Sequence, residues 1–159
     1  HRSEQQRYDC EIRFGRDAHP KQNSFLLFPE QHIPVCIPTL EGRAGKLANE
    51  SNQLLHILND GKKLPVWDDW LAQAQLTEQP NTQRGIEFST QDQVINAVKA
   101  GAGFAMLDRN MISHELAQQL LIQFSPVEVS GPYGYWLDIP DDKQGLSKVI
   151  HFRDWLLEQ

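Results

Sequence analysis

The chain has 159 residues, of which 40% are hydrophobic and 23% are charged, and its formal net charge is −6 at pH 7. This composition predicts a globular chain that can bury a core and need not be disordered. The acidic balance argues against DNA binding by these residues themselves, because contacts to phosphates require clustered Lys and Arg side chains. No apolar run approaches the roughly 20 residues of a membrane span. Two cysteines, Cys10 and Cys36, are too few for a disulfide scaffold and predict reduced thiols in a cytoplasmic protein.

The first part of the sequence predicts short strands joined by polar loops. Residues 1–9 are polar and predict a flexible lead-in. Three β-rich runs predict strands at 10–15, 24–28 and 32–37. Pro34 and Pro38 bracket the core of the third run, which places that strand at a sheet edge or at a crossing between two lobes.

The middle of the chain predicts a loop, a strand and a helix. Residues 41–53 hold little apolar material and predict a surface loop with a frayed helix, whereas residues 54–58 predict a buried strand. Apolar side chains at i, i+3, i+4 and i+7 predict an amphipathic helix over 66–76, whose apolar face consists of Trp67, Trp70, Leu71 and Ala74.

Residues 86–107 carry the clearest local signal. Ile86–Phe88 predicts a strand, Thr90 with Gln93 forms a capping-box pattern, and Gly101 marks the end of the helix. Residues 104–107 predict the next strand. Strand, helix and strand at this spacing predict a βαβ unit, and therefore the parallel sheet of an α/β fold.

The last part of the chain predicts two helices and a strand. Residues 110–121 predict a short helix with Ser113 as its candidate cap and one face formed by Ile112, Leu116 and Leu120. Residues 133–139 predict a strand, and residues 146–159 predict a closing helix.

No pattern in the sequence demands catalysis, a cofactor or a metal. Gly101-Ala102-Gly103 closes a helix, whereas a dinucleotide-binding motif must open one. The six histidines include no pair at i, i+4 and no cysteine at ligand spacing, and His56 is interpreted as a hydrogen-bonded core residue. The pairs Asp68-Asp69 and Asp141-Asp142 are interpreted as charges at helix starts. We therefore expect a non-enzymatic protein without a cofactor.

Two segments are candidates for binding a small ligand. Phe88-Ser89-Thr90 leads from a strand end into a helix N-terminus, where free N–H groups and two hydroxyls suit an anion. Plain helix capping explains the same residues equally well. Phe14-Gly15-Arg16 ends another strand, and Arg16 is either a bidentate donor for a carboxylate or a solvated loop residue. The sequence leaves both pairs of alternatives open.

Six segments occur in an order that matches a known pattern over residues 9–159. They are EIRFGR, FPEQHIPVCIPTL, VWDDWL, GIEFSTQDQVINAVKAGAGFAML, YGYWLDIP and FRDWLLEQ. The series resembles the C-terminal effector-binding domain of LysR-type transcriptional regulators. Within that family it is most similar to the subgroup that resembles the glycine-cleavage activator.

The resemblance implies a fold and a binding site. The fold is the α/β, type II periplasmic-binding-protein-like fold of two lobes, with an effector held between them. Lobe I, here partial, would comprise residues 1–34 and 136–159, and lobe II residues 35–135, with crossings near Val35 and Tyr135. By motif, the implied effector contacts are Phe14, Arg16, Phe88, Ser89, Thr90 and either Tyr135 or Trp136.

The resemblance also implies partners. These are a small-molecule effector, self-association, and DNA bound only through a winged helix-turn-helix domain that has no counterpart in these residues; no membrane is implied. Because that domain and the opening of lobe I have no counterpart, we expect a truncated chain, and residues 41–53 look like an insertion. The alternative function is a solute-binding protein of a transport system, which shares the fold.

Overall fold

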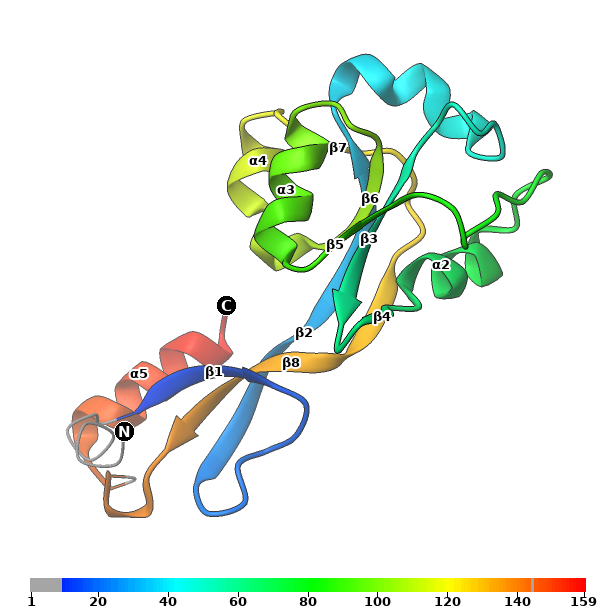
Figure 1. Cartoon of the computed structure of the whole chain (residues 1–159). Coiled ribbons are helices and arrows are strands. Elements are labelled where there is room, and N and C mark those ends of the chain that lie inside the picture. Colours follow the sequence, from blue (N-terminus) through cyan, green and yellow to red (C-terminus); the bar gives the residue numbers. More distant parts are fainter. Residues whose placement is uncertain (1–9, 144) are drawn as a thin grey trace. The chain divides into compact units, whose positions relative to one another are not determined.

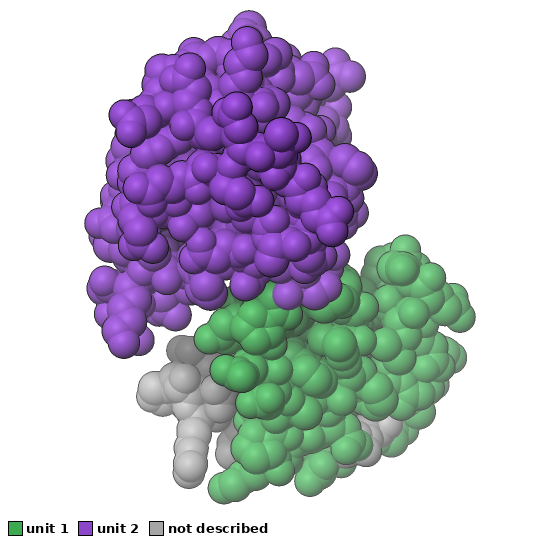
Figure 2. All heavy atoms as spheres, turned by 90° about the vertical axis from the view of Figure 1, so that its right-hand side faces the viewer, with its two compact units in different colours: residues 1–30, 131–159 green, residues 31–130 purple. Residues whose placement is uncertain are grey.

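A computed structural model describes residues 10–143 and 145–159. The chain divides into two compact units, residues 1–30 with 131–159 (unit 1) and residues 31–130 (unit 2) (Figure 2). Two long strands, β2 (Asn23–Cys36) and β8 (Val129–Ile139), contribute residues to both units. The lobe limits near Val35 and Tyr135 stay predictions, and the predicted flexible lead-in lies outside the described residues.

The sheet of unit 2 confirms the predicted βαβ unit. Its central strand β3 (Leu54–Asn59) pairs in parallel with both β5 (Ile86–Phe88) and β6 (Phe104–Asp108) (Figure 1). The other pairings are antiparallel. Strand β2 pairs with β6, the short strand β7 (Ile122–Gln123) pairs with β2, and the short strand β4 (Lys62–Lys63) pairs with β3.

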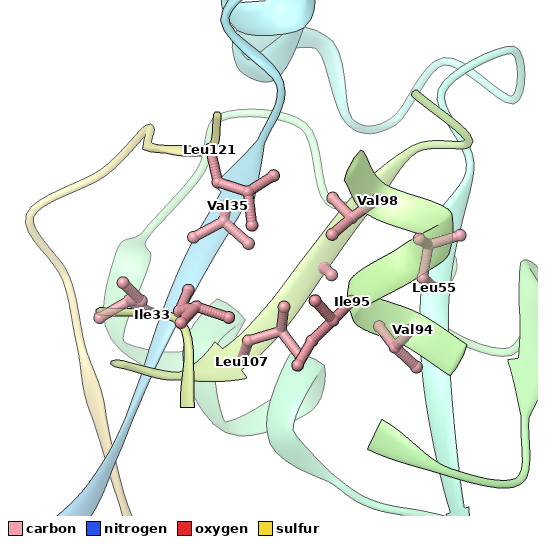
Figure 3. Packing of buried hydrophobic residues seen from close by; sticks show 10 residues of the cluster. Ile33, Val35, Leu55, Val94, Ile95, Val98, Leu107 and Leu121 are labelled. Carbon is pink, nitrogen blue, oxygen red and sulfur yellow. The ribbon is translucent and has the colours of Figure 1, made fainter. Parts of the chain in front are cut away.

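Helices cover both faces of the unit 2 sheet. Successive side chains along a strand point to opposite faces, so alternate residues of β6 pack against different helices. Ala105 and Leu107 pack with α3 (Gln91–Lys99) and with Leu116 of α4 (Ser113–Ala117). Figure 3 shows Leu107 among the buried α3 side chains Val94, Ile95 and Val98. The alternate residues of β6, Phe104 and Met106, pack with α2 (Val66–Ala74) and with η1 (Pro38–Lys46), a 3-10 helix. Unit 2 is therefore a three-layer α/β structure.

Unit 1 has a smaller core. Strand β1 (Glu11–Gly15) pairs antiparallel with β8, and α5 (Ser147–Leu157) contributes Val149. Leu137 and Ile139 of β8 are buried with Val149, and the residues packed around them are Cys10, Phe25, Leu27 and Leu156. A short 3-10 turn, η3 (Asp141–Lys143), connects β8 to the last helix.

Helix α3 ends as its sequence predicts. Gly101 adopts a left-handed φ of 85°, its N–H donates to Val98 at 3.0 Å, and the N–H of Ala102 donates to Ala97 at 3.0 Å. These two bonds form a Schellman motif, which satisfies the last carbonyls of the helix. Gly103 then permits close packing, since a Cβ there would lie 2.2 Å from the carbonyl oxygen of Gln53.

The predicted strands at 24–28 and 32–37 form a single strand, so the predicted break at Pro29 is wrong. An edge position for this strand is also wrong, because Val35 pairs with Ala105 on one side and with Gln123 on the other. Pro34 lacks an N–H, but its carbonyl accepts from the N–H of Phe124 at 3.1 Å. Phe124 directly follows β7, so the end of this neighbouring strand bonds to the carbonyl of Pro34, the backbone hydrogen-bonding group that proline retains.

Two local predictions need correction. The segment 41–53 is not simply a surface loop, because Leu47 and Asn52 are each 2% exposed.

The helix predicted over 110–121 is shorter than expected. Helix α4 follows η2 (Arg109–Met111) and ends at Ala117, and a left-handed φ of 58° at Gln119 prevents its continuation. Ser113 is not the cap, because Ile112 is the N-cap and makes no side-chain capping bond. Leu121 rather than Leu120 is buried, since the turn changes the register.

Candidate functional site

The turn after β5 carries three of the predicted ligand contacts. Phe88 is half-buried and packs beside the α3 cluster, while Ser89 and Thr90 are exposed. The Gln93 N–H donates to Thr90 Oγ1 at 3.2 Å, and Gln93 Oε1 accepts from the N–H groups of Ser89 at 3.0 Å and Thr90 at 3.3 Å. The capping interpretation of Thr90 is therefore confirmed, and ligand binding at this turn stays a prediction.

Thr90→Ala is expected to destabilise α3 by about 1 kcal/mol, because the Gln93 N–H loses its acceptor. Ser89→Ala is the matched control, since Ser89 contributes its backbone N–H and not its hydroxyl to the capping box. Amide hydrogen exchange along α3 measures the effect. Equal exchange rates in the two variants would contradict the capping geometry.

The position of this turn follows from the parallel strands. The carboxyl ends of β3, β5 and β6 lie at one edge of the unit 2 sheet, where α/β proteins bind ligands. Asp108 ends β6 at the same edge and is 2% exposed. Its Oδ1 accepts from the backbone N–H groups of Gln31 and Asn110, both at 3.2 Å. The sequence interpretation missed Asp108, although an acid directly after an apolar strand is a readable signal.

In unit 1 the structure brings Phe14 and Tyr135 together. Their ring centroids lie 5.0 Å apart, Phe14 also stacks on Tyr133 at 5.4 Å, and Phe28 lies 4.8 Å from Tyr135. These four residues form an aromatic cluster in which Phe14 is 52% exposed. Tyr133 and Phe28 were not predicted, because the contact of β2 with β8 cannot be read from local pattern.

The register of β1 and β8 distinguishes Tyr135 from Trp136. Phe14 pairs with Tyr135, whereas Arg13 pairs with Trp136. Neighbouring residues on a strand point to opposite faces, so Trp136 does not join the aromatic cluster. Its indole N–H instead donates to the carbonyl of Gly15 at 3.0 Å, and the Arg13 guanidinium lies 5.9 Å from the ring centroid.

Arg16 is exposed, and the structure shows no hydrogen bond or ion pair from it to any other described residue. The loop that carries it is anchored by Asp138, whose side chain is fully buried. Arg13 Nε donates to Asp138 Oδ2 at 2.5 Å and Ser24 Oγ donates to Oδ1 at 2.6 Å. Arg13 also donates to the carbonyl of Asp17 at 2.9 Å. Arg13 is therefore the structural arginine of this segment, and a ligand contact by Arg16 stays a prediction.

Burial alone would raise the pKa of the Asp138 carboxyl group. The hydrogen bonds from Arg13 and Ser24, together with the positive charge of Arg13, outweigh burial and hold the pKa below its usual range. The same hydrogen bond raises the pKa of Arg13. Both groups are therefore charged at neutral pH.

The other ionisable candidates have structural roles. Burial raises the pKa of the Cys36 thiol to about 11, so Cys36 is not an activated nucleophile. Burial lowers the pKa of His56, and Nε2 of this neutral side chain lies 2.8 Å from the carbonyl oxygen of Arg84, to which it donates. His56 is thus the hydrogen-bonded core residue that the sequence predicts. The described residues include no group of three or more His, Cys, Asp or Glu side chains that could hold a metal.

The predicted contacts fall into two sets. Phe14, Arg16 and Tyr135 belong to unit 1, and the turn Phe88-Ser89-Thr90 belongs to unit 2. Within each unit the structure places the predicted residues next to one another along the chain or across a strand pair. That both sets bind one ligand stays a prediction.

Comparison with known proteins identifies the family. The sequence profile described as "LysR substrate binding domain" matches residues 2–159. The chain belongs to this family. The LysR relatives include the transcriptional activator AmpR of Pseudomonas aeruginosa, 29% identical over 150 residues, which are 94% of this chain and 49% of the relative. The glycine cleavage system transcriptional activator of Escherichia coli K12 is also 29% identical over 150 residues, which are 94% of this chain and 48% of that protein.

Solved structures of LysR domains agree with this assignment. The effector domain of AmpR from Pseudomonas aeruginosa aligns with a TM-score of 0.68 and 26% identity over 98% of this chain and 73% of that chain. A substituted effector-binding domain from Citrobacter freundii aligns with a TM-score of 0.71 at 19% identity, over 98% of this chain and 76% of that chain. This second similarity concerns the fold alone. The chain therefore has the type II periplasmic-binding-protein-like α/β fold that the resemblance implied.

The comparisons also bear on the class of function. The relatives named above are transcriptional activators rather than enzymes or transport proteins, which favours the regulator over the solute-binding alternative. The chain spans about half the length of these curated relatives. In the part of the chain that the structure describes, every helix is too short or too polar to cross a membrane.

Proposed function

We propose that this chain is the effector-sensing domain of a LysR-type transcriptional regulator. In this proposal it binds a small polar metabolite with an anionic group, in the cytoplasm, and relays binding to a winged helix-turn-helix elsewhere in a longer, self-associating protein. The observation that carries the proposal is the family match over residues 2–159. The domain performs no chemistry on its ligand; it changes the activity of the protein through binding.

The residues suit such a ligand in complementary ways. Arg16 supplies a guanidinium for a carboxylate, because its charge is not used by another described residue. Ser89 and Thr90 supply hydroxyls beside the positive end of the α3 dipole, which favours an anion. The exposed ring of Phe14 with Tyr135 offers an apolar surface for the carbon skeleton. That these groups hold one ligand is part of the proposal.

The proposal predicts a ligand that depends on Arg16. A thermal-shift screen of the chain against carboxylate and amino-acid metabolites is expected to find a stabilising compound, since a ligand that binds only the folded state raises the melting temperature. Arg16→Ala should weaken that compound about ten- to a hundredfold, which corresponds to one charge-assisted hydrogen bond.

Lys21→Ala is the matched control, because Lys21 is an exposed cation of the same loop. Its affinity for the compound should equal that of the unsubstituted chain. If Arg16→Ala and Lys21→Ala weaken the compound equally, the guanidinium has no specific role. If both leave the affinity unchanged, the proposed contact must be abandoned.

We also predict that the 159-residue chain does not bind duplex DNA at near-physiological salt. Its formal net charge is −6, and contacts to phosphates depend on clustered cations. A gel-shift titration with a random and a promoter-derived duplex measures this. Tight, sequence-selective binding by these residues alone would refute the proposal that a separate winged helix-turn-helix binds the DNA.

A further inference from the structure

Three backbone carbonyls of one polar segment converge on a single guanidinium. Arg84 Nη2 donates to the carbonyl oxygens of Leu47 at 2.7 Å and Asn49 at 3.2 Å, and Nη1 donates to that of Asn52 at 3.0 Å. A planar guanidinium presents five donors in a fixed fork, whereas a lysine ammonium presents one compact charge. Arg84 is therefore matched to this arrangement of carbonyls.

The segment that provides these carbonyls is itself well fixed. Asn52 is 2% exposed, and its Nδ2 donates to the carbonyl of Lys46 at 2.7 Å. Arg43 Nη2 donates to the carbonyl of Ser51 at 3.2 Å. Residues 47–52 thus form a defined platform within unit 2, in the part of the chain that the sequence marks as insertion-like.

Arg84 links this platform to β5. It lies two residues before Ile86, in a stretch that other side chains also hold: Thr82 Oγ1 donates to Asp68 Oδ1 at 2.6 Å, and Lys63 Nζ donates to the carbonyl of Gln83 at 2.5 Å. The bond from His56 to the carbonyl of Arg84 adds a third attachment. We name residues 82–85 the strap.

The strap matters because β5 is short. Only Ile86, Glu87 and Phe88 pair with β3, and among the described residues β5 has no second neighbouring strand. Ser89 and Thr90 follow immediately. Three residues are the short end of the usual range of strand lengths. The bonds of the strap therefore add to the β5–β3 ladder in holding the start of the turn.

We infer that Arg84 is a positioning residue for the turn Ser89-Thr90 and that the 47–52 platform sets the place of this turn through Arg84. The inference rests on the proposed function, in which the turn contacts the ligand. Residues 47–52 then influence ligand affinity without touching the ligand. Substitutions in the platform would tune binding from a distance by moving the start of α3.

The test compares Arg84→Lys and Arg84→Ala with Arg43→Ala in the 159-residue chain. Arg43 is the matched control, because it also donates to a platform carbonyl but makes no contact with the strap. Proton–nitrogen spectra and amide exchange should show shifted Ser89 and Thr90 resonances and exchange at residues 88–93 at least about tenfold faster in both Arg84 variants. Arg43→Ala removes a bond within the platform but keeps Arg84 and its bonds, so these amides should change much less than in the Arg84 variants.

A sulfate titration, followed at the Ser89 and Thr90 amides, separates this inference from the proposed function. We expect the Arg84 variants to need about tenfold more sulfate than the unsubstituted chain. Unchanged exchange at residues 88–93 in Arg84→Lys, or faster exchange spread evenly over β6 and α2, would overturn the positioning role. If exchange changes locally but sulfate perturbs the turn in no variant, Arg84 positions the turn and the anionic ligand of the proposed function is refuted.

Discussion

Trp70→Ala is expected to destabilise unit 2 by about 3–5 kcal/mol, as is usual for the truncation of a buried tryptophan. Trp70 is 1% exposed and joins α2 to the sheet. Its ring lies edge-on to Trp67 at 5.8 Å and to Phe124 at 6.0 Å, and its N–H donates to the carbonyl of Val127 at 3.0 Å. The alanine variant would lose these contacts and leave the carbonyl without its donor. Urea unfolding followed by circular dichroism measures the loss.

Trp155→Ala is the matched control, because Trp155 on α5 is 56% exposed. It should cost at most about 1 kcal/mol. Trp70→Phe separates packing from the hydrogen bond, and should cost less than the alanine variant because most of the ring volume remains. Similar losses for Trp70→Ala and Trp155→Ala would show that the α2 core does not determine the stability of unit 2.

The elements that could be predicted from sequence are those whose signal is local. Helix α2 follows from the spacing of Trp67, Trp70 and Leu71, all of which are buried. The β5–α3–β6 unit follows from an apolar run, a capping box and a glycine stop, each of which acts within a few residues. Local propensity and tertiary packing agree in these segments, so the prediction succeeds.

The remaining elements depend on contacts between distant residues. Leu47 lies in a polar stretch, but it is buried in a cluster with Trp70 and Phe104, which lie more than 20 residues further along the chain. The carbonyls of Leu47 and Asn52 accept from Arg84, which lies more than 30 residues further along the chain. The continuity of β2 through Pro29 and Pro34 likewise depends on neighbouring strands. A local rule about proline cannot include the Pro34 carbonyl, which accepts from Phe124 at the end of a neighbouring strand that lies about 90 residues away in sequence.

The candidate site likewise combines local signals, which the sequence shows, with contacts between distant residues, which it does not show. Thr90 was readable as a cap, and Phe14 was readable as a strand end, because both signals are local. The pairing of Phe14 with Tyr135 spans more than 100 residues, and only the register settles that Tyr135 rather than Trp136 is the neighbour. In EIRFGR, Arg13 lies within β1 and bonds to Asp138, whereas Arg16 follows the end of the strand and is exposed. The two arginines therefore differ in role.

Asp138→Asn is expected to cost unit 1 about 2–3 kcal/mol at neutral pH, because it leaves the Arg13 guanidinium without its buried counterion. Arg13 remains partly exposed, with 27% of its side-chain surface accessible, so water compensates for part of the loss. The indole resonance of Trp136 reports on the change, since this N–H donates to Gly15 beside Arg13. Asp142→Asn, in the exposed η3 turn, is the matched control and should change little.

The dependence of this loss on pH has a definite sign. The pKa of Asp138 is lower in the folded chain than the value of about 3.9 expected for an unfolded one. Its contribution to the free energy of unfolding is therefore complete above the unfolded value and disappears as pH falls through that value toward the folded pKa. Urea unfolding between neutral pH and about pH 3 should show the unsubstituted chain and Asp138→Asn converging as the solution becomes acidic. Parallel curves would mean that the Arg13–Asp138 pair does not contribute through its charge, and that the loop carrying Arg16 is held by other contacts.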